Sequence, residues 1–311
     1  MPSRIMVKES SMKFCEYIKT CREHFSLTQE ELVNLLFQSN DIFSGLDAVT
    51  LSRWERCLTY PNIERQQYFI KAMQSYSHSI FPCSDSLSLE EVEKEVYEKG
   101  IQKVIGKHKR FILTFPNELL DEDAMQFNTL DTFKNPHDYL NLTYTFIKKI
   151  TNEMINIDFE RFEQWAKHPS SFFLIASYQR QFFGVMFSIR IKESIFNDLM
   201  HFKMSENDIK LEHLASCEEK GCEYPFTLFT YTEQTATILI LRYYAHLLKH
   251  KNHIGTLGSL PKSPEGEKLI STLGLKHFRN DPKEVSPIKA YQATMEEVLL
   301  NPYALNMLFK K

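Results

Sequence analysis

The sequence predicts two folded domains of different class, an all-α domain at the N-terminus and an α/β (α+β) domain with a mixed sheet behind it. The chain has 311 residues, which is enough for about two domains. Its 43% hydrophobic and 13% aromatic residues are typical of chains that bury sizeable cores. Apolar residues recur at helical spacing up to about residue 77, and strand-like and helical segments alternate from about residue 108. We therefore expect a helical domain at 1–80, a linker with a connecting helix at 81–107, and the α/β domain at 108–311.

Composition indicates the cellular compartment of the protein and gives no support for a nucleic-acid partner. The net charge is −3, so any nucleic-acid binding must come from a local pattern. The first eight residues hold no apolar core of signal-peptide length, and the longest apolar run, 236–248, is too short to cross a bilayer. Six cysteines are scattered along the chain, which favours reduced thiols over a disulfide framework. We expect a cytoplasmic protein with no membrane association.

The N-terminal domain begins with two predicted helices. Apolar residues at positions 14, 18, 21 and 25 mark one face of a helix over about 12–25. The stretch 28–31 then reads Thr-Gln-Glu-Glu, a capping box in which Thr28 and Glu31 satisfy each other's backbone N–H groups. Leucines at 32, 35 and 36 give this second helix its buried stripe.

A third and a fourth helix complete the domain. The polar stretch 38–45 contains a glycine and is expected to be a loop. Asp47 is a good N-cap for a helix with the sequence Ala-Val-Thr-Leu-Ser-Arg-Trp-Glu-Arg over 48–56. Pro61 ends this segment, and 63–73 is expected to form another amphipathic helix.

These motifs resemble the XRE (Cro/CI-type) helix-turn-helix family. The match rests on Leu-Thr-Gln-Glu-Glu-Leu at 27–32, followed by Val-Thr-Leu-Ser-Arg-Trp-Glu at 49–55 and then by Pro61. It covers about residues 12–77, with the two blocks in the family's order. The resemblance implies that the helix beginning near Asp47 enters the major groove of DNA.

The resemblance also assigns roles to residues. Asp47, Ala48, Val49 and Arg53 match the base-facing positions, with Arg53 suited to a guanine and Val49 to a thymine methyl. Gln29 matches a position that contacts phosphate, whereas Leu51, Trp54 and Glu55 match structural positions. The residues expected to contact DNA are Thr28, Gln29, Asp47, Ala48, Val49, Thr50, Ser52, Arg53 and Arg56.

Three features depart from the family pattern. The connection 37–46 is longer than the family's tight turn, and Cys57 stands where the family usually has a glycine. Residues 12–77 carry seven Lys/Arg against eight Asp/Glu, a net charge of −1, so one copy should bind DNA weakly and a homodimer is expected. The alternative is a helical protein-interaction domain of the same architecture.

The linker is marked by a short polar stretch containing proline and serine at 81–88. Ser88 and Glu91 then suggest the capped start of a helix that runs to about residue 105. Its brief apolar stripe either packs on its own domain or seeds a dimer contact.

The elements of the larger domain are predicted from strand-like and helical patterns that alternate along the chain. The expected elements, in order, are a strand at 110–115, helices at 139–154 and 158–166, a hairpin of 171–178 with 181–191, a polar stretch with a short helix, a strand at 224–231, a long helix at 232–250, a strand at 252–260, a helix at 263–273, and strands near 275–278 and 288–292.

This order of elements, together with the Leu-Gly-Leu turn at 273–275, resembles the GNAT acetyltransferase fold. The resemblance implies a coenzyme A pyrophosphate loop at the start of the long helix, which is glycine-rich in the family. Here 232–237 reads Thr-Glu-Gln-Thr-Ala-Thr and has no glycine. The position of the family's tyrosine general acid falls on Ile270. No catalytic residue and no cofactor are therefore assigned, although acetyl-CoA remains the cofactor that the fold would imply.

Other candidate sites follow from the same domain. An apolar ligand pocket is expected beside the 231–235 junction, lined by Phe229, Tyr231, Thr232, Gln234 and Thr235. Two weaker patterns suggest metal ligands, one of three histidines and one of a histidine with two cysteines. They comprise His246, His250 and His253, and His213, Cys217 and Cys222. The commoner explanation is a solvated helix end for the first and loop thiols for the second.

The sequence thus predicts a DNA-binding transcriptional regulator whose partner is a double-stranded operator. Its GNAT-like domain is expected to be non-catalytic and to sense a small molecule or mediate assembly. Two alternatives remain, a DNA-tethered acetyl-CoA-dependent N-acetyltransferase and a protein-interaction adaptor.

Overall fold

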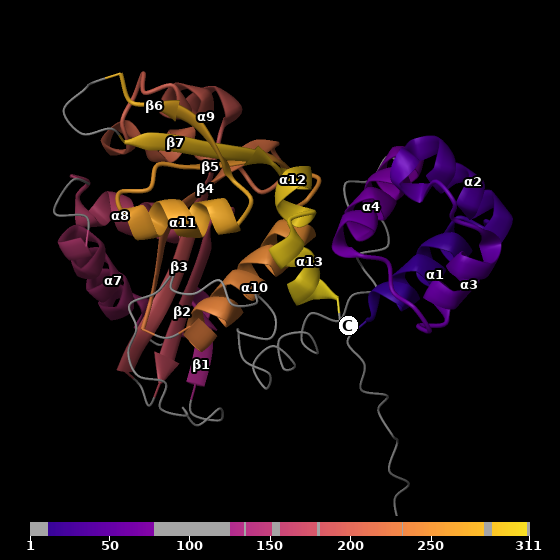
Figure 1. Ribbon diagram of the computed structural model, residues 1–311. Helices are drawn as coiled ribbons and strands as arrows, with labels where there is room; N and C mark the ends of the chain where they lie inside the picture. The colour runs from indigo at the N-terminus through magenta and orange to yellow at the C-terminus, as the bar shows by residue number, and fades with distance from the viewer. Residues whose placement is uncertain are drawn as a thin grey trace, which may run out of the picture. The chain divides into compact units, whose positions relative to one another are not determined.

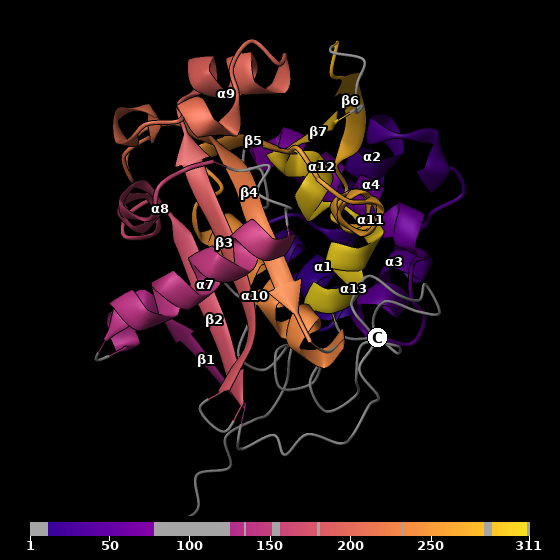
Figure 2. The same cartoon turned by 90° about the vertical axis from the view of Figure 1, so that its left-hand side faces the viewer.

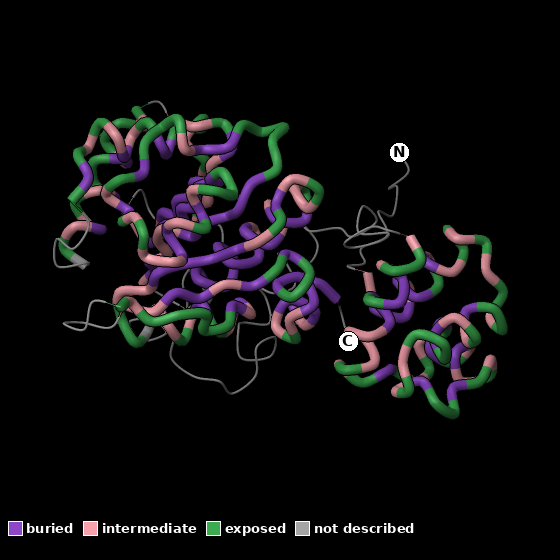
Figure 3. The backbone as a smooth tube through the Cα atoms, turned by 90° about the horizontal axis from the view of Figure 1, so that it is seen from above, coloured by how far each residue is buried: buried purple, intermediate pink, exposed green. Residues whose placement is uncertain are grey.

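The computed structural model describes residues 12–77, 125–133, 135–150, 156–178, 181–231, 233–282 and 288–309. The chain separates into two compact units. One, the helical unit, comprises Met1–Gly106 with Leu299–Lys311, and the other, the sheet unit, comprises Lys107–Val298. In each unit the buried residues lie inside and the exposed ones outside (Figure 3). No helix among the described residues is long and apolar enough to cross a membrane.

The helical unit contains five α-helices and one 3₁₀ turn among the described residues (Figure 1). They are α1 (Phe14–His24), α2 (Gln29–Ser39), η1 (Asp41–Phe43), α3 (Ala48–Glu55), α4 (Ile63–Ser77) and α13 (Pro302–Leu308). Both predicted caps are confirmed. Glu31 N–H donates to Thr28 Oγ1 at 3.2 Å, and Thr50 N–H donates to Asp47 Oδ1 at 2.7 Å.

The long connection between α2 and α3 is a structured turn. Asn40 accepts from Ile42 N–H and starts η1, which buries Phe43 completely. Leu46 follows with 8% exposure, and Gly45 supplies the positive φ of 78° that reverses the chain between them. The extra residues therefore add a core contact to the domain.

The C-terminal segment packs into the helical unit. The Phe309 ring lies 5.0 Å from both the Phe14 and the Tyr17 rings, and Gln67 Nε2 donates to the Leu300 carbonyl at 2.8 Å. Residues 299–309 were expected within the larger domain. They belong to the helical unit because Phe309 packs into an aromatic cluster there.

A disulfide joins Cys15, in the first turn of α1, to Cys57, two residues beyond the end of α3. The two Cα atoms are 5.4 Å apart. This corrects the expectation that all cysteines are reduced, because the fold brings together two thiols that 42 positions separate in sequence. Cys57 has φ 57°, a left-handed conformation that favours glycine over other residues.

The sheet unit is built on a seven-stranded mixed sheet in the order β1-β2-β3-β4-β5-β7-β6. The strands are β1 (Met125–Thr129), β2 (Phe172–Tyr178), β3 (Gln181–Ile191), β4 (Gly221–Thr230), β5 (Ile254–Ser259), β6 (Lys276–Asn280) and β7 (Lys289–Thr294). Its helices are α7 (Pro136–Ile150), α8 (Phe159–Ala166), α9 (Glu193–Met200), α10 (Glu233–Lys249), α11 (Pro264–Thr272) and α12 (Met295–Leu299).

Helices cover both faces of the sheet (Figures 1 and 2). Successive side chains of a strand point to opposite faces. On β3, Phe187 packs against Phe162 of α8, whereas Ser188 faces α10. The two faces therefore differ, one lined by an apolar cluster and the other holding polar groups as well.

The two central strands β4 and β5 run parallel and pair only at one end. Their pairing covers Gly221 to Glu223 against Ile254 to Leu257, and Ser259 Oγ of β5 donates to the Pro225 carbonyl of β4 at 3.2 Å, whereas β4 continues to Thr230. A register shift between Phe187 and Ser188 places a bulge in the pairing of β3 with β4. The sheet thus opens along the second half of β4, which leads into α10.

Most predicted elements of this unit are confirmed within a few residues. The predicted strand at 110–115 and the linker helix at 88–105 lie outside the described residues. The strand that occupies the sheet edge is β1 at Met125–Thr129, and α12 and α13 follow β7 where no helix was expected.

Candidate functional site

Helix α3 has one face fixed in the core and one face open. Leu51 is fully buried and Trp54 is 3% exposed, so these two side chains hold the helix to its neighbours. Val49 is 66% exposed, and Arg53, one turn further on, is exposed as well.

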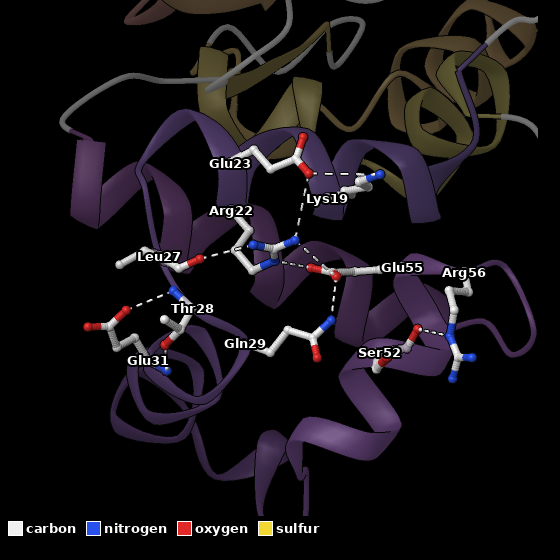
Figure 4. A network of polar contacts seen from close by, with 10 residues as sticks. All are labelled: Lys19, Arg22, Glu23, Leu27, Thr28, Gln29, Glu31, Ser52, Glu55 and Arg56. Atoms are coloured by element: carbon white, nitrogen blue, oxygen red, sulfur yellow. Dashed lines mark hydrogen bonds and ion pairs between the residues drawn. The ribbon is translucent and has the colours of Figure 1, made fainter.

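A polar network fixes the position of α3 (Figure 4). Glu55 is 8% exposed, and its Oε1 accepts from Arg22 Nε of α1 at 2.5 Å. Its Oε2 accepts from Gln29 Nε2 of α2 at 2.7 Å, and Arg22 Nη1 also donates to the Leu27 carbonyl at 3.1 Å. The hydrogen bond to Glu55 raises the pKa of Arg22. One carboxylate therefore ties three helices together.

Three of the residues expected to contact DNA make hydrogen bonds within the helical unit. Thr28 and Asp47 cap α2 and α3, and the cap hydrogen bond holds the pKa of Asp47 below its usual value. Gln29 was expected at a phosphate, but its side-chain amide donates to Glu55. Their part in an interface would be to orient the two helices and their backbone N–H groups.

The remaining predicted residues line the outer side of α3. Val49, Arg53 and Arg56 are exposed, and Arg56 Nε donates to the Ser52 carbonyl at 3.2 Å. Ala48, Thr50 and Ser52 are half-buried. The accessible groups are thus one apolar side chain and two guanidinium groups on a single short helix.

The ligand residues expected at the start of α10 are only partly brought together. The Phe229 and Tyr231 rings lie 5.0 Å apart, but Phe229 also packs 4.2 Å from the Phe146 ring and belongs to the apolar core. Thr235 is 1% exposed. Thr232 and the side chain of Gln234 lie outside the described residues.

Ile270 stands at the position where the sequence comparison expected a tyrosine acid. Ile270 lies on α11 and is 6% exposed, packed as a core residue. The described residues contain no group of three or more His, Cys, Asp and Glu side chains arranged to hold a metal. His253 lies beyond the end of α10, and Cys222 is on β4, where burial raises the pKa of its thiol to about 12.

Sequence reasoning missed a buried polar cluster between β3, β4 and α10. Glu223 is fully buried and accepts from the Ser188 hydroxyl, while His246 Nε2 lies 3.4 Å and Arg190 Nε 3.9 Å from its two oxygens. Burial alone would raise the pKa of Glu223, but His246, Ser188 and Arg190 together lower it. Arg190 Nε and Nη2 have no hydrogen-bond partner among the described residues. The strand pairing of Arg190 with Glu223 creates this cluster, and no local motif signals it.

A pocket of about 490 Å³ lies at the same end of the sheet. Its lining includes Asp131, Lys167, His168, Ser171 and Phe172. The Ser171 hydroxyl is buried without a hydrogen-bond partner among the described residues. Phe172 connects the pocket to the polar cluster, since its ring lies 4.9 Å from that of His246.

Comparisons with known proteins concern the fold of the sheet unit. No protein-family model and no curated protein matches the chain. Among solved structures, an N-acyl amino acid synthase from uncultured soil microbes aligns at 14% identity and TM-score 0.40, covering 57% of this chain and 93% of its own. An acetyltransferase from Streptococcus agalactiae aligns at 12% and 0.37, covering 55% and 98%. A GNAT-family acetyltransferase from Staphylococcus aureus aligns at 12% and 0.34, covering 55% and 99%. All three alignments have TM-scores below 0.5, so they assign neither a family nor an activity to this chain.

Proposed function

We propose that the helical unit binds double-stranded DNA in a sequence-specific manner and that the protein is a transcriptional regulator. One observation carries this proposal. The inner face of α3 is fixed by Leu51, Trp54 and the Glu55 network, while Val49 and Arg53 on its outer face remain exposed. A rigid helix that presents an arginine and an apolar side chain suits the major groove.

The chemistry of the two exposed side chains defines what they would read. A guanidinium donates two parallel hydrogen bonds to O6 and N7 of guanine, the commonest specific contact in protein–DNA complexes. A valine side chain favours the methyl group of thymine. Arg56, at the end of the helix, would contact a phosphate and contribute affinity without sequence information.

Binding would require two copies. The domain's net charge of −1 gives one copy little attraction to phosphate. A homodimer on paired half-sites doubles the number of base contacts, so we expect a palindromic operator.

The sheet unit would sense a ligand or mediate assembly. The pocket beside His168 and Ser171 is the cavity that a small molecule would enter. Such a ligand regulates DNA binding only if its affinity differs between the competent and incompetent states of the protein.

Selection from a random duplex library tests the proposal. The full chain is incubated with the library, and the bound duplexes are amplified and sequenced over several rounds. We expect an enriched palindromic motif that contains a guanine in each half-site. An unenriched library would refute unaided DNA recognition and would favour the adaptor hypothesis.

Acyl transfer is the second candidate, because the ladder pairing of β4 with β5 ends at Glu223 and β4 continues toward the start of α10 without it. Against it, 232–237 contains no glycine to admit a pyrophosphate, and Ile270 cannot donate a proton. Calorimetric titration with acetyl-CoA separates the candidates. We expect no binding heat, and saturable binding with turnover of an amine would reverse the preference.

A further inference from the structure

We propose that the Cys15–Cys57 disulfide is a thiol switch that controls the order of α3 and, through it, DNA binding. The second part of this inference rests on the proposed function, whereas the first part does not. The disulfide joins the first turn of α1 to the residue that follows α3 after Arg56.

The position of Cys57 makes the disulfide a clamp on the end of α3. The C-cap residue Arg56 and then Cys57 end the helix, with Cys57 N–H donating to the Trp54 carbonyl at 2.9 Å. Leu58 N–H donates to the Arg53 carbonyl, also at 2.9 Å, so the last turn carrying Arg53 depends on the backbone conformation at Cys57. This is the hydrogen-bond pattern of a helix C-terminus closed by a left-handed residue.

That conformation is costly for a residue other than glycine. Cys57 has φ 57°, which disfavours an L-residue by roughly 1–2 kcal/mol. While the disulfide is closed, the bond to the fully buried Cys15 holds Cys57 there. Once the bond is reduced, only the two backbone hydrogen bonds oppose the strain. The last turn of α3 then opens more often.

The two cysteines of the disulfide differ in exposure. Cys15 is fully buried, whereas Cys57 is half-buried and followed by Leu58, which is 62% exposed. A small dithiol reductant would therefore attack at the Cys57 side. Its thiolate forms a mixed disulfide and releases Cys15 as a thiolate, and the second thiol of the reductant then displaces Cys57. Two electrons and two protons pass from the dithiol to the protein, and a peroxide reverses the change with release of water and an alcohol.

Hydrogen exchange on the full chain tests the switch without any DNA. Oxidised and dithiothreitol-reduced protein are compared, with thiols counted by alkylation and mass spectrometry. We expect the amides of residues 53–58 to exchange about ten-fold faster after reduction, the factor that corresponds to release of the left-handed strain. Amides of α10 should be unaffected.

Three variants sharpen the test. Cys15→Ser should show the fast exchange under both conditions, and Cys217→Ser, which removes an exposed thiol of the sheet unit, should behave as wild type. Cys57→Gly cannot form the disulfide but adopts the left-handed conformation freely, so its exchange should be slow and independent of redox state. If Cys15→Ser does not fold, Cys57→Gly and the reduced wild type suffice.

The DNA arm uses the duplex recovered by selection. Oxidised protein and Cys57→Gly should bind it about ten-fold more tightly than reduced protein or Cys15→Ser, in proportion to the loss of order in α3. Equal exchange in oxidised and reduced wild type would overturn the switch, as would a redox response that persists in Cys57→Gly. If the selection recovers no duplex, the proposed function fails while the exchange data still decide on the switch.

Discussion

Glu55 of α3 and Arg22 of α1 form an ion pair in which the Glu55 side chain is 5% and the Arg22 side chain 18% exposed. Because Gln29 of α2 donates to the same carboxylate, Glu55 links α3 to both α1 and α2. The position of the exposed face of α3 therefore depends on this ion pair as well as on packing.

Removing Arg22 should destabilise the helical unit strongly. Arg22→Met leaves the Glu55 carboxylate buried with no opposite charge, which costs about 3 kcal/mol of unfolding free energy. Lys19→Met is the matched control on the same helix, since Lys19 pairs with Glu23 at 3.8 Å in solvent and contributes under about 1 kcal/mol. Urea unfolding followed by circular dichroism measures both. Equal losses would contradict the role given to Glu55.

The C-terminal residues should contribute to the stability of the helical unit. Phe309 is 5% exposed, so Phe309→Ala should lower the stability of this unit by about 3 kcal/mol. Phe37→Ala, at 59% exposure, should change it little. Hydrogen exchange in α1 and α4 reports the unit directly. Unchanged protection in Phe309→Ala would show that Phe14 and Tyr17 do not need it.

Acid should weaken the sheet unit through His250. Burial, reinforced by His246, Arg190 and Lys249, lowers the pKa of His250 from 6.5 to about 4, with Glu223 opposing. The unfolded chain therefore binds a proton between these pH values that the folded chain does not. Stability is full above pH 6.5 and falls as the pH drops toward 4.

Calorimetry across this pH range tests that slope. His250→Gln should flatten it, whereas His253→Gln, in the turn after the same helix, should leave it as in wild type. The same slope in wild type and His250→Gln would assign the acid sensitivity to another group.

The sheet unit should lose more stability when one charge of the buried cluster is removed than when both charges are removed. Glu223→Gln leaves Arg190 fully buried without a counter-charge and should cost about 3 kcal/mol. Adding Arg190→Met should recover much of that loss, a coupling that a double-mutant cycle measures in denaturant. Additive losses would show that the two groups do not interact.

Elements with a strong local pattern were predictable from sequence. The hairpin of β2 and β3 follows from two runs rich in Phe, Val and Ile on both sides of Gln179-Arg180, and the caps at Thr28 and Asp47 follow from side-chain chemistry. Each depends on residues within a few positions of one another.

Contacts between residues distant in sequence could not be predicted. Cys15 meets Cys57, Phe309 meets Phe14, and Arg190 meets Glu223 only after the helices and strands have been placed. His246 and His250, which the sequence grouped as candidate metal ligands, do lie close together, with their rings 4.7 Å apart. The spacing of the histidines did not indicate that Glu223 lies beside them, because strand register sets the position of Glu223.

The most direct test of DNA recognition by α3 is to change one base contact and ask whether the preferred sequence changes with it. Selection is repeated with Arg53→Gln, because glutamine donates to and accepts from adenine where arginine donates to guanine. We expect the motif to keep its length and symmetry and to exchange guanine for adenine at one position in each half-site. A motif identical to that of the wild type would contradict DNA recognition by α3, because its exposed face would then not be reading the bases.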